Sequence, residues 1–171
     1  MAGEKKGRNV GEWFEEGRRC FHQPDGVGAV KALEQVIEMD PAYRHPDGDN
    51  PYFYLGKINE MEDRLDAAIG HYTRSLAINP LDEESLIGRG SCYTVTRQHD
   101  QAVADFVKVL QLPERQRQAA RKDLLYAIAE NYRRLEDWQQ ALNWGRQALA
   151  ADPDNYRHQQ LLKEIAGKAD K

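Results

Sequence analysis

Small and large residues alternate along this chain in a pattern that returns every 34 to 39 residues. An alanine opens an apolar stretch in each copy, and these alanines lie 39, 34 and 39 residues apart: Ala29, Ala68, Ala102 and Ala141. Twelve residues before each alanine stands another small residue: Gly17, Gly56, Gly90 and Ala129. Sixteen residues before each stands a large apolar or aromatic one: Trp13, Tyr52, Leu86 and Leu125. A period in this range predicts an array of helical repeats.

The spacing within a copy predicts two antiparallel helices. In the first helix the large and small residues lie three to four positions apart, which places them on one face. The small residue lets the second helix approach closely, and the alanine of the second helix fills the facing groove. Three copies then have a proline, which cannot continue a helix: Pro41, Pro80 and Pro153. One such hairpin cannot bury both of its faces, so we expect the copies to stack.

These positions resemble the tetratricopeptide repeat, with its pattern W-x2-L-G-x2-Y, then A-x3-F, then P. The second copy matches best, through Tyr52, Leu55, Gly56, Ala68, Tyr72 and Pro80. In the fourth copy Gly145 stands where an aromatic is expected, with Trp144 beside it. The resemblance implies an all-α fold, a right-handed α-solenoid of about four helix-turn-helix repeats plus a C-terminal capping helix.

Turn residues and breakers set the expected boundaries. We expect a disordered N-terminus over residues 1–8 and a single domain over residues 9–169. The repeats are expected at residues 10–43, 49–82, 83–116 and 122–155, and the capping helix at 155–169. Asn50 and Pro51 predict a capped start for the first helix of the second repeat. No breaker follows Pro113, so we expect the first helix of the fourth repeat to be longer by about a turn.

Composition narrows the class of protein. The formal net charge is −4, which argues against general nucleic-acid binding because that needs a basic face. We find no apolar run of the roughly 20 residues that a membrane span requires, and no secretory signal at the N-terminus. Two cysteines are too few for a disulfide framework. We therefore expect a cytoplasmic protein without membrane insertion.

The sequence has no pattern that predicts chemistry. No two of its five histidines lie three or four positions apart, and no cysteine or acidic cluster completes a metal site. We expect these histidines to be solvated at the surface. Phosphate-binding glycine loops and nucleophile elbows are also absent from the sequence. We expect no enzyme activity, no catalytic residue, no bound metal and no cofactor.

The resemblance implies that the first helices of the repeats line a concave groove for a partner. The expected groove residues are Phe14, Arg18, Asn50, Phe53, Tyr54, Lys57, Ile87, Ser91, Tyr126, Glu130 and Arg133. Phe14, Phe53 and Tyr126 occupy one position of three repeats. Two interpretations remain open: these rings are exposed anchors for an apolar partner segment, or they pack locally between adjacent first helices. In the first case Arg18 and Lys57 are placed to pair with carboxylates of the partner.

The function that the resemblance implies is that of a scaffold or adaptor. It would bind a peptide or helical segment of another protein, with apolar or aromatic anchors and acidic groups, in the groove. Two alternatives remain: a secretion-type chaperone holding a translocator subunit, and a self-assembling scaffold that forms a homo-oligomer. An RNA-binding helical array is disfavoured because the chain is acidic and lacks a continuous basic stripe.

Overall fold

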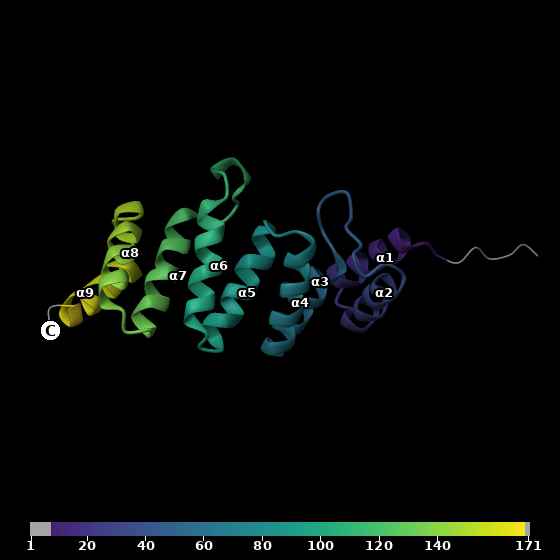
Figure 1. Cartoon of the computed structure of the whole chain (residues 1–171), viewed down its shortest axis with the longest axis horizontal. Coiled ribbons are helices and arrows are strands. Elements are labelled where there is room, and N and C mark those ends of the chain that lie inside the picture. The colour runs from purple at the N-terminus through teal and green to yellow at the C-terminus, as the bar shows by residue number, and fades with distance from the viewer. Residues whose placement is uncertain (1–7, 170–171) are drawn as a thin grey trace, which may run out of the picture. The chain divides into compact units, whose positions relative to one another are not determined.

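A computed structural model of the chain describes residues 8–169, and within this range it contains nine α-helices and no strand (Figure 1). The helices are α1 (Val10–His22), α2 (Gly26–Met39), α3 (Pro51–Met61), α4 (Leu65–Ile78), α5 (Glu83–Val95), α6 (His99–Gln111), α7 (Arg121–Arg134), α8 (Trp138–Ala151) and α9 (Tyr156–Ala169). A short 3-10 helix, η1, spans Glu114–Gln116. The predicted all-α repeat fold is confirmed.

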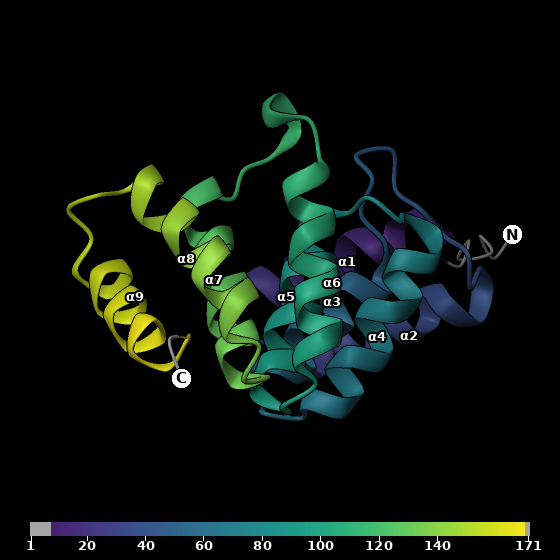
Figure 2. The ribbon, with the colours of Figure 1, turned by 60° about the vertical axis from the view of Figure 1, so that its left-hand side comes forward.

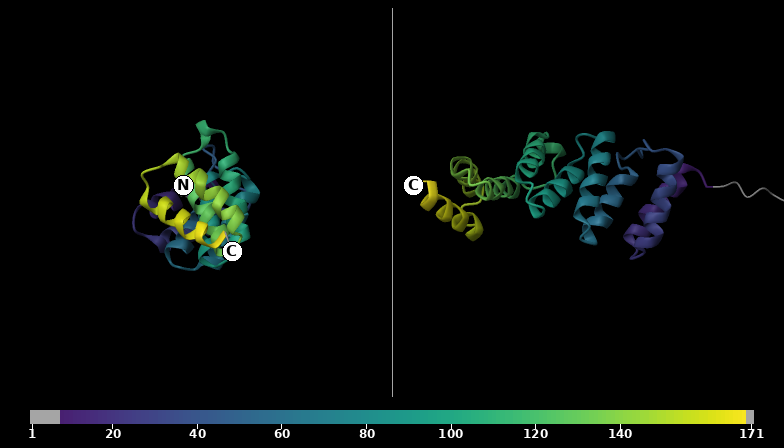
Figure 3. Two further views of the ribbon diagram at one scale, coloured as in Figure 1. Left: turned by 90° about the vertical axis from the view of Figure 1, so that its left-hand side faces the viewer. Right: turned by 60° about the horizontal axis from the view of Figure 1, so that its bottom comes forward.

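The chain divides into two compact units, residues 1–85 and 86–171, and the boundary falls within the first turn of α5. In unit 1, α1 packs on α2 and α3 packs on α4, and Figure 3 shows α3 and α4 lying side by side. In unit 2, α7 packs on α8, and α9 packs on α8 at the C-terminal end (Figure 2). The single domain expected over residues 9–169 stays a prediction.

The small residues of the repeat are the places where the two helices of a hairpin meet. A Cβ atom added to Gly56 would lie 2.7 Å from the ring of Tyr72, which is fully buried. The other two glycines are placed in the same way. A Cβ atom added to Gly17 would lie 2.8 Å from Leu33, and one added to Gly90 would lie 2.9 Å from Phe106. The alanines of the second helices have no exposed surface: Ala29, Ala68, Ala102 and Ala141. The predicted pairing of small and large residues is therefore confirmed.

The turns inside three hairpins have one conformation. Each places a residue other than glycine in the left-handed region, with φ of 58°, 62° and 59°: Asp63, Arg97 and Glu136. The next amide donates to a carbonyl five residues earlier, as in the 2.8 Å bond from Arg64 N to Asn59 O. These φ > 0 residues are 34 and 39 positions apart, the spacing of the sequence repeat. The repeat therefore extends to backbone geometry that no side-chain pattern revealed.

Helix starts follow the capping residues. Asn50 accepts a hydrogen bond from Phe53 N at 3.2 Å and Pro51 is the first helical residue, as predicted. The Asn50 amide also donates to Ser75 Oγ at 2.9 Å, which ties the start of α3 to α4. At α1, Asn9 and Glu12 form a reciprocal capping box with two bonds of 2.9 Å.

The start of α7 and the N-terminal segment are two boundaries predicted from the sequence. The extra turn at the start of α7 is wrong: α7 begins at Arg121, and the chain between Pro113 and Arg121 contains only η1. The guanidinium of Arg117 donates to Leu110 O at 3.3 Å, so this segment folds back on the end of α6. Of the predicted disordered segment, residues 1–7 lie outside the described residues, whereas the Arg8 guanidinium lies 4.8 Å from the ring centroid of Trp13.

Candidate functional site

The predicted groove residue Phe14 is covered by the linker between α2 and α3, residues 40–50. Phe14 has no exposed surface. Its ring centroid lies 5.2 Å from that of Tyr43, 5.3 Å from that of His45 and 5.8 Å from that of Tyr54. For Phe14, local packing is thus the correct interpretation, and the exposed anchor is wrong because the linker already fills the space above the ring.

Arg18, also predicted to meet a partner, is bound within the chain. Its guanidinium donates to the Asp47 carboxylate at 2.7 Å, and His45 Nδ1 lies 2.7 Å from the same carboxylate. Burial favours a higher pKa for Asp47, but the hydrogen bonds from His45, the Asp49 amide and Arg18 outweigh it and lower that pKa to about 2. The linker therefore supplies the carboxylate that we expected from a partner.

The predicted residues of the second repeat are mostly interior. Asn50, Phe53 and Tyr54 are 1%, 8% and 4% exposed, so none offers the free surface that we expected. The Tyr54 hydroxyl donates to Asp49 at 2.5 Å, and burial followed by this carboxylate raises the pKa of Tyr54. Three further predicted residues are partly exposed but line neither the cleft between α7 and α9 nor the cleft between α2 and α4: Lys57, Ile87 and Ser91.

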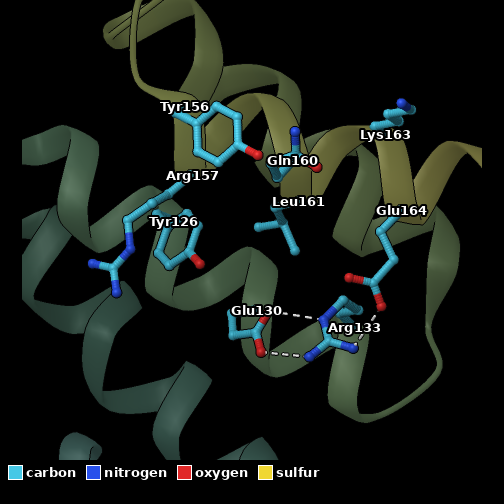
Figure 4. Close-up of a pocket in the computed structure, with 9 residues that line it drawn as sticks. All are labelled: Tyr126, Glu130, Arg133, Tyr156, Arg157, Gln160, Leu161, Lys163 and Glu164. Carbon is cyan, nitrogen blue, oxygen red and sulfur yellow. Dashed lines mark hydrogen bonds and ion pairs between the residues drawn. The ribbon is translucent and has the colours of Figure 1, made fainter.

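The structure brings the three remaining predicted residues together in a cleft between α7 and α9. Figure 4 shows Tyr126, Glu130 and Arg133 on α7 facing α9 across an open space, whose volume is about 590 Å³. The α9 wall consists of Tyr156, Arg157, Gln160, Leu161, Lys163 and Glu164. We call this space the α7/α9 cleft. Both helices pack on α8 and make few contacts with each other, which leaves the space open.

Ion pairs link the charged side chains of α7 with each other and with α9 in the α7/α9 cleft. Arg133 donates two hydrogen bonds to the Glu130 carboxylate, one from Nε at 2.8 Å and one from Nη2 at 2.6 Å. Its Nη1 donates to the Glu164 carboxylate of α9 at 3.1 Å. Arg134 adds a 3.0 Å bond to Glu130. Burial alone would raise the pKa of Glu130, but the two arginines outweigh it and lower that pKa. Glu130 is therefore a fixed carboxylate that orients Arg133.

Aromatic rings define the upper part of the cleft. The Tyr126 ring is partly exposed and stacks on His158 with 5.2 Å between ring centroids. His158 is 3% exposed, and its Nδ1 lies 3.0 Å from Ala148 O, so this nitrogen must carry the proton and donate. Tyr156 is 69% exposed. The cleft thus offers one ring that is packed on His158 and one ring that is largely exposed to solvent.

The charges that line the cleft favour a ligand with acidic groups. Three basic and two acidic side chains line it, and both acidic ones are bonded to Arg133. Among residues 8–169, Arg157 and Lys163 have no ion-pair partner. The side chains of Tyr126, Tyr156 and Leu161 supply apolar surface beside them. The site can therefore bind an apolar group and a carboxylate at the same time.

Sequence reasoning missed the α9 wall and the role of His158. The expectation that all histidines are solvated is wrong for His158, which lies three positions before Leu161 and seven before Ile165 on the inward face of α9. That spacing was readable in the sequence. The opening between α7 and α9 was not, because it depends on how far two helices diverge.

Metal-binding clusters, reactive thiols and membrane-spanning helices would each be evident in the described part of the chain. No group of three or more histidine, cysteine, aspartate or glutamate side chains there could hold a metal ion. Cys20 and Cys92 are buried, and burial raises the pKa of the Cys20 thiol. None of the helices between residues 8 and 169 has the length and apolar character needed to cross a membrane.

Comparisons with known proteins agree with this architecture. No protein-family model matches the chain. A UDP-N-acetylglucosamine–peptide N-acetylglucosaminyltransferase from Giardia intestinalis is 23% identical over an alignment of 126 residues that covers 63% of this chain and 8% of that protein. This chain therefore spans less than a tenth of that relative.

Two solved structures are similar in fold to nearly the whole of this chain. MamA from Desulfovibrio magneticus RS-1, residues 41 to the end, has a TM-score of 0.75 and 16% identity, covering 96% of this chain and 87% of that one. A tetratricopeptide repeat protein from Parabacteroides merdae has a TM-score of 0.75 and 22% identity, covering 96% of this chain and 62% of that one. With the glycine contacts and the repeated turns, these similarities show that the chain has the fold of tetratricopeptide-repeat proteins.

Proposed function

We propose that this chain is a protein-interaction scaffold that binds a segment of a partner protein in the α7/α9 cleft. The observation that carries the proposal is the meeting of Tyr126, Glu130 and Arg133 with the wall of α9 around an open space of about 590 Å³. A helix-lined groove of this kind suits an amphipathic or extended peptide. No activated nucleophile lines the cleft, so the arrangement supports binding rather than catalysis.

The lining residues define the chemistry of the partner segment. Its apolar or aromatic side chain would enter beside Tyr126 and Leu161, where Tyr156 can close over it. Its carboxylates would pair with Arg157 and Lys163 at the rim. The partner is thus a peptide segment with a large apolar residue next to aspartate or glutamate. Outside the cleft, a groove role stays a prediction for Lys57, Ile87 and Ser91, whereas Phe14 and the predicted residues of the second repeat at positions 50, 53 and 54 are buried.

The test is selection of peptides from a displayed random library on the whole chain, followed by affinity measurement with fluorescence anisotropy. We expect enrichment of an aromatic or large aliphatic residue within a few positions of an acidic one, with dissociation constants in the micromolar range. We expect Arg157→Glu to weaken the selected peptides by about tenfold or more, since it replaces an attractive contact with a repulsive one.

Arg146→Glu is the matched control, because Arg146 is an exposed arginine of α8 that does not line the cleft. It changes the net charge by the same amount and should leave binding within a factor of two or so. Equal weakening by both variants would show that only overall charge matters and would contradict the assignment to the cleft. Light scattering on the same samples separates peptide capture from the alternative of self-assembly.

A further inference from the structure

A second cleft lies in unit 1, in the corner between α2 and α4, with α3 as its floor. Both α2 and α4 pack on α3. The space has a volume of about 550 Å³, within the range of small-molecule sites. We call it the α2/α4 cleft. Leu55 of α3 and the apolar side chains Val30 and Ile37 of α2 contribute to its lining.

The two sides of the α2/α4 cleft carry opposite charges. Glu34 and Glu38 lie four positions apart on α2, so they share one face of that helix. His71 and Arg74 lie three positions apart on α4, and Arg64 precedes the same helix. No ion pair joins the two sides in the described part of the chain, although each carries two full charges. The acidic and basic groups therefore face a shared space without neutralising each other directly.

The basic side contains a polar atom that the protein leaves unsatisfied. His71 Nδ1 is buried and has no hydrogen-bond partner among the described residues. Burial, followed by the charge of Arg74, lowers the pKa of His71, so the ring is neutral at pH 7. A buried nitrogen without a partner is unfavourable, which favours binding of a ligand that supplies the partner.

Arg74 lies close enough to His71 for its charge to act on the imidazole, and no hydrogen bond or ion pair engages its donors among the described residues. Its guanidinium lies 5.7 Å from the ring centroid of Tyr52, and the same ring stacks on His71 at 6.3 Å. Arg64 is differently placed, because it donates to Asn59 Oδ1 at 2.8 Å and pairs with Glu62. Arg74 and His71 can thus bind one carboxylate together. Arg64 is less available to a ligand, because Asn59 and Glu62 already occupy its donors.

We propose that the α2/α4 cleft binds a small zwitterion of the amino-acid class, with its carboxylate on Arg74 and His71 and its ammonium group toward Glu34 and Glu38. A simple anion would satisfy the basic side and meet the two glutamates unfavourably. A simple cation would leave His71 Nδ1 without its partner. Only a ligand with both charges, separated by an apolar stretch that covers Leu55, complements the whole lining.

The test uses probes that differ in one charge. The His71 imidazole signals of the whole chain are followed by NMR during titration with glycine, 4-aminobutanoate and 6-aminohexanoate, and with hexanoate and hexylamine as singly charged references. His71→Gln assigns the signals. We expect a saturable shift with at least one of the longer zwitterions and binding about tenfold or more weaker for the singly charged references.

Variants then test the orientation. Arg74→Gln should abolish the shift, whereas Arg44→Gln, a matched change at an exposed arginine outside the cleft, should leave it unchanged. Glu34→Gln should weaken the zwitterion and leave the weak response to hexanoate as it was. Circular dichroism verifies that each variant is folded.

Two results would overturn the proposal. Equal affinity for the zwitterions and for the singly charged references would show that the opposite charges of the cleft do not select the ligand. No saturable shift with any probe would show that the α2/α4 cleft does not bind this class of ligand.

Discussion

Replacing Gly56 with alanine tests the contact from which the fold was inferred. The added methyl group would lie 2.7 Å from Tyr72, whereas carbon atoms in good contact are about 3.5–4.0 Å apart. Tyr72 cannot move aside easily, because its ring is fully buried and its hydroxyl donates to Glu60 at 2.5 Å. The helix must therefore shift by most of an ångström.

The expected magnitude is a balance of two terms. Overpacking a buried site destabilises by about 1–3 kcal/mol, and Gly→Ala inside a helix stabilises by about 1 kcal/mol. With so short a contact we expect Gly56→Ala to lower the free energy of unfolding by about 1–2 kcal/mol. Gly70→Ala is the matched control in α4, because nothing lies within 4 Å of its added Cβ. It should stabilise by up to about 1 kcal/mol.

The assay is urea-induced unfolding followed by far-UV circular dichroism, comparing both variants with the natural sequence. We expect the two midpoints to move in opposite directions. If Gly56→Ala is as stable as Gly70→Ala, the close approach of α3 and α4 is not what Gly56 provides, and the inferred reason for the repeat pattern is wrong.

Three further predictions concern other buried or charged contacts. Phe14→Ala should destabilise the protein by about 3–5 kcal/mol in the same assay, since the ring is wholly buried; a loss below 1 kcal/mol would mean that the linker does not cover it. Asp105→Ala should reduce stability by about 3–5 kcal/mol because it removes the carboxylate that pairs with the Arg89 guanidinium through two bonds of 2.8 Å; if the double variant Arg89→Met/Asp105→Leu is as unstable in urea as Asp105→Ala, loss of the charge pairing is not the cause. The pKa of Asp47 is lowered to about 2, below its ordinary 3.8, so its carboxylate contributes stability above pH 3.8 that is lost as the pH falls toward 2. Asp47→Asn should flatten the dependence of thermal stability on pH between pH 4 and 2, and an unchanged slope would show that the bonds from His45, the Asp49 amide and Arg18 do not stabilise the carboxylate.

Much of the fold was predictable because it depends on local spacing. Gly56 and Tyr72 sit where a close helix crossing needs a small and a large residue, and Asn50 and Pro51 mark a helix start by their own chemistry. The chain between Pro113 and Arg121 was mispredicted, since the bond from Arg117 to α6 is a tertiary contact without a local signal.

The candidate site was predictable only in part. Tyr126, Glu130 and Arg133 follow from the register of the repeat, which fixes the face of α7 on which they lie. The burial of Phe14 does not follow from that register, because five extra linker residues reach over α1 and bring Tyr43 onto the ring. Sequence reasoning treated the linker as a connection, and its packing depends on contacts distant in sequence.

Hydrogen–deuterium exchange on the chain with a selected peptide bound tests the central claim most directly. If the α7/α9 cleft is the binding site, amides in residues 126–133 and 156–164 gain protection on binding, and α1 and α2 exchange as before. Protection confined to residues 10–61, with α9 unchanged, would place the peptide on unit 1 and contradict the account.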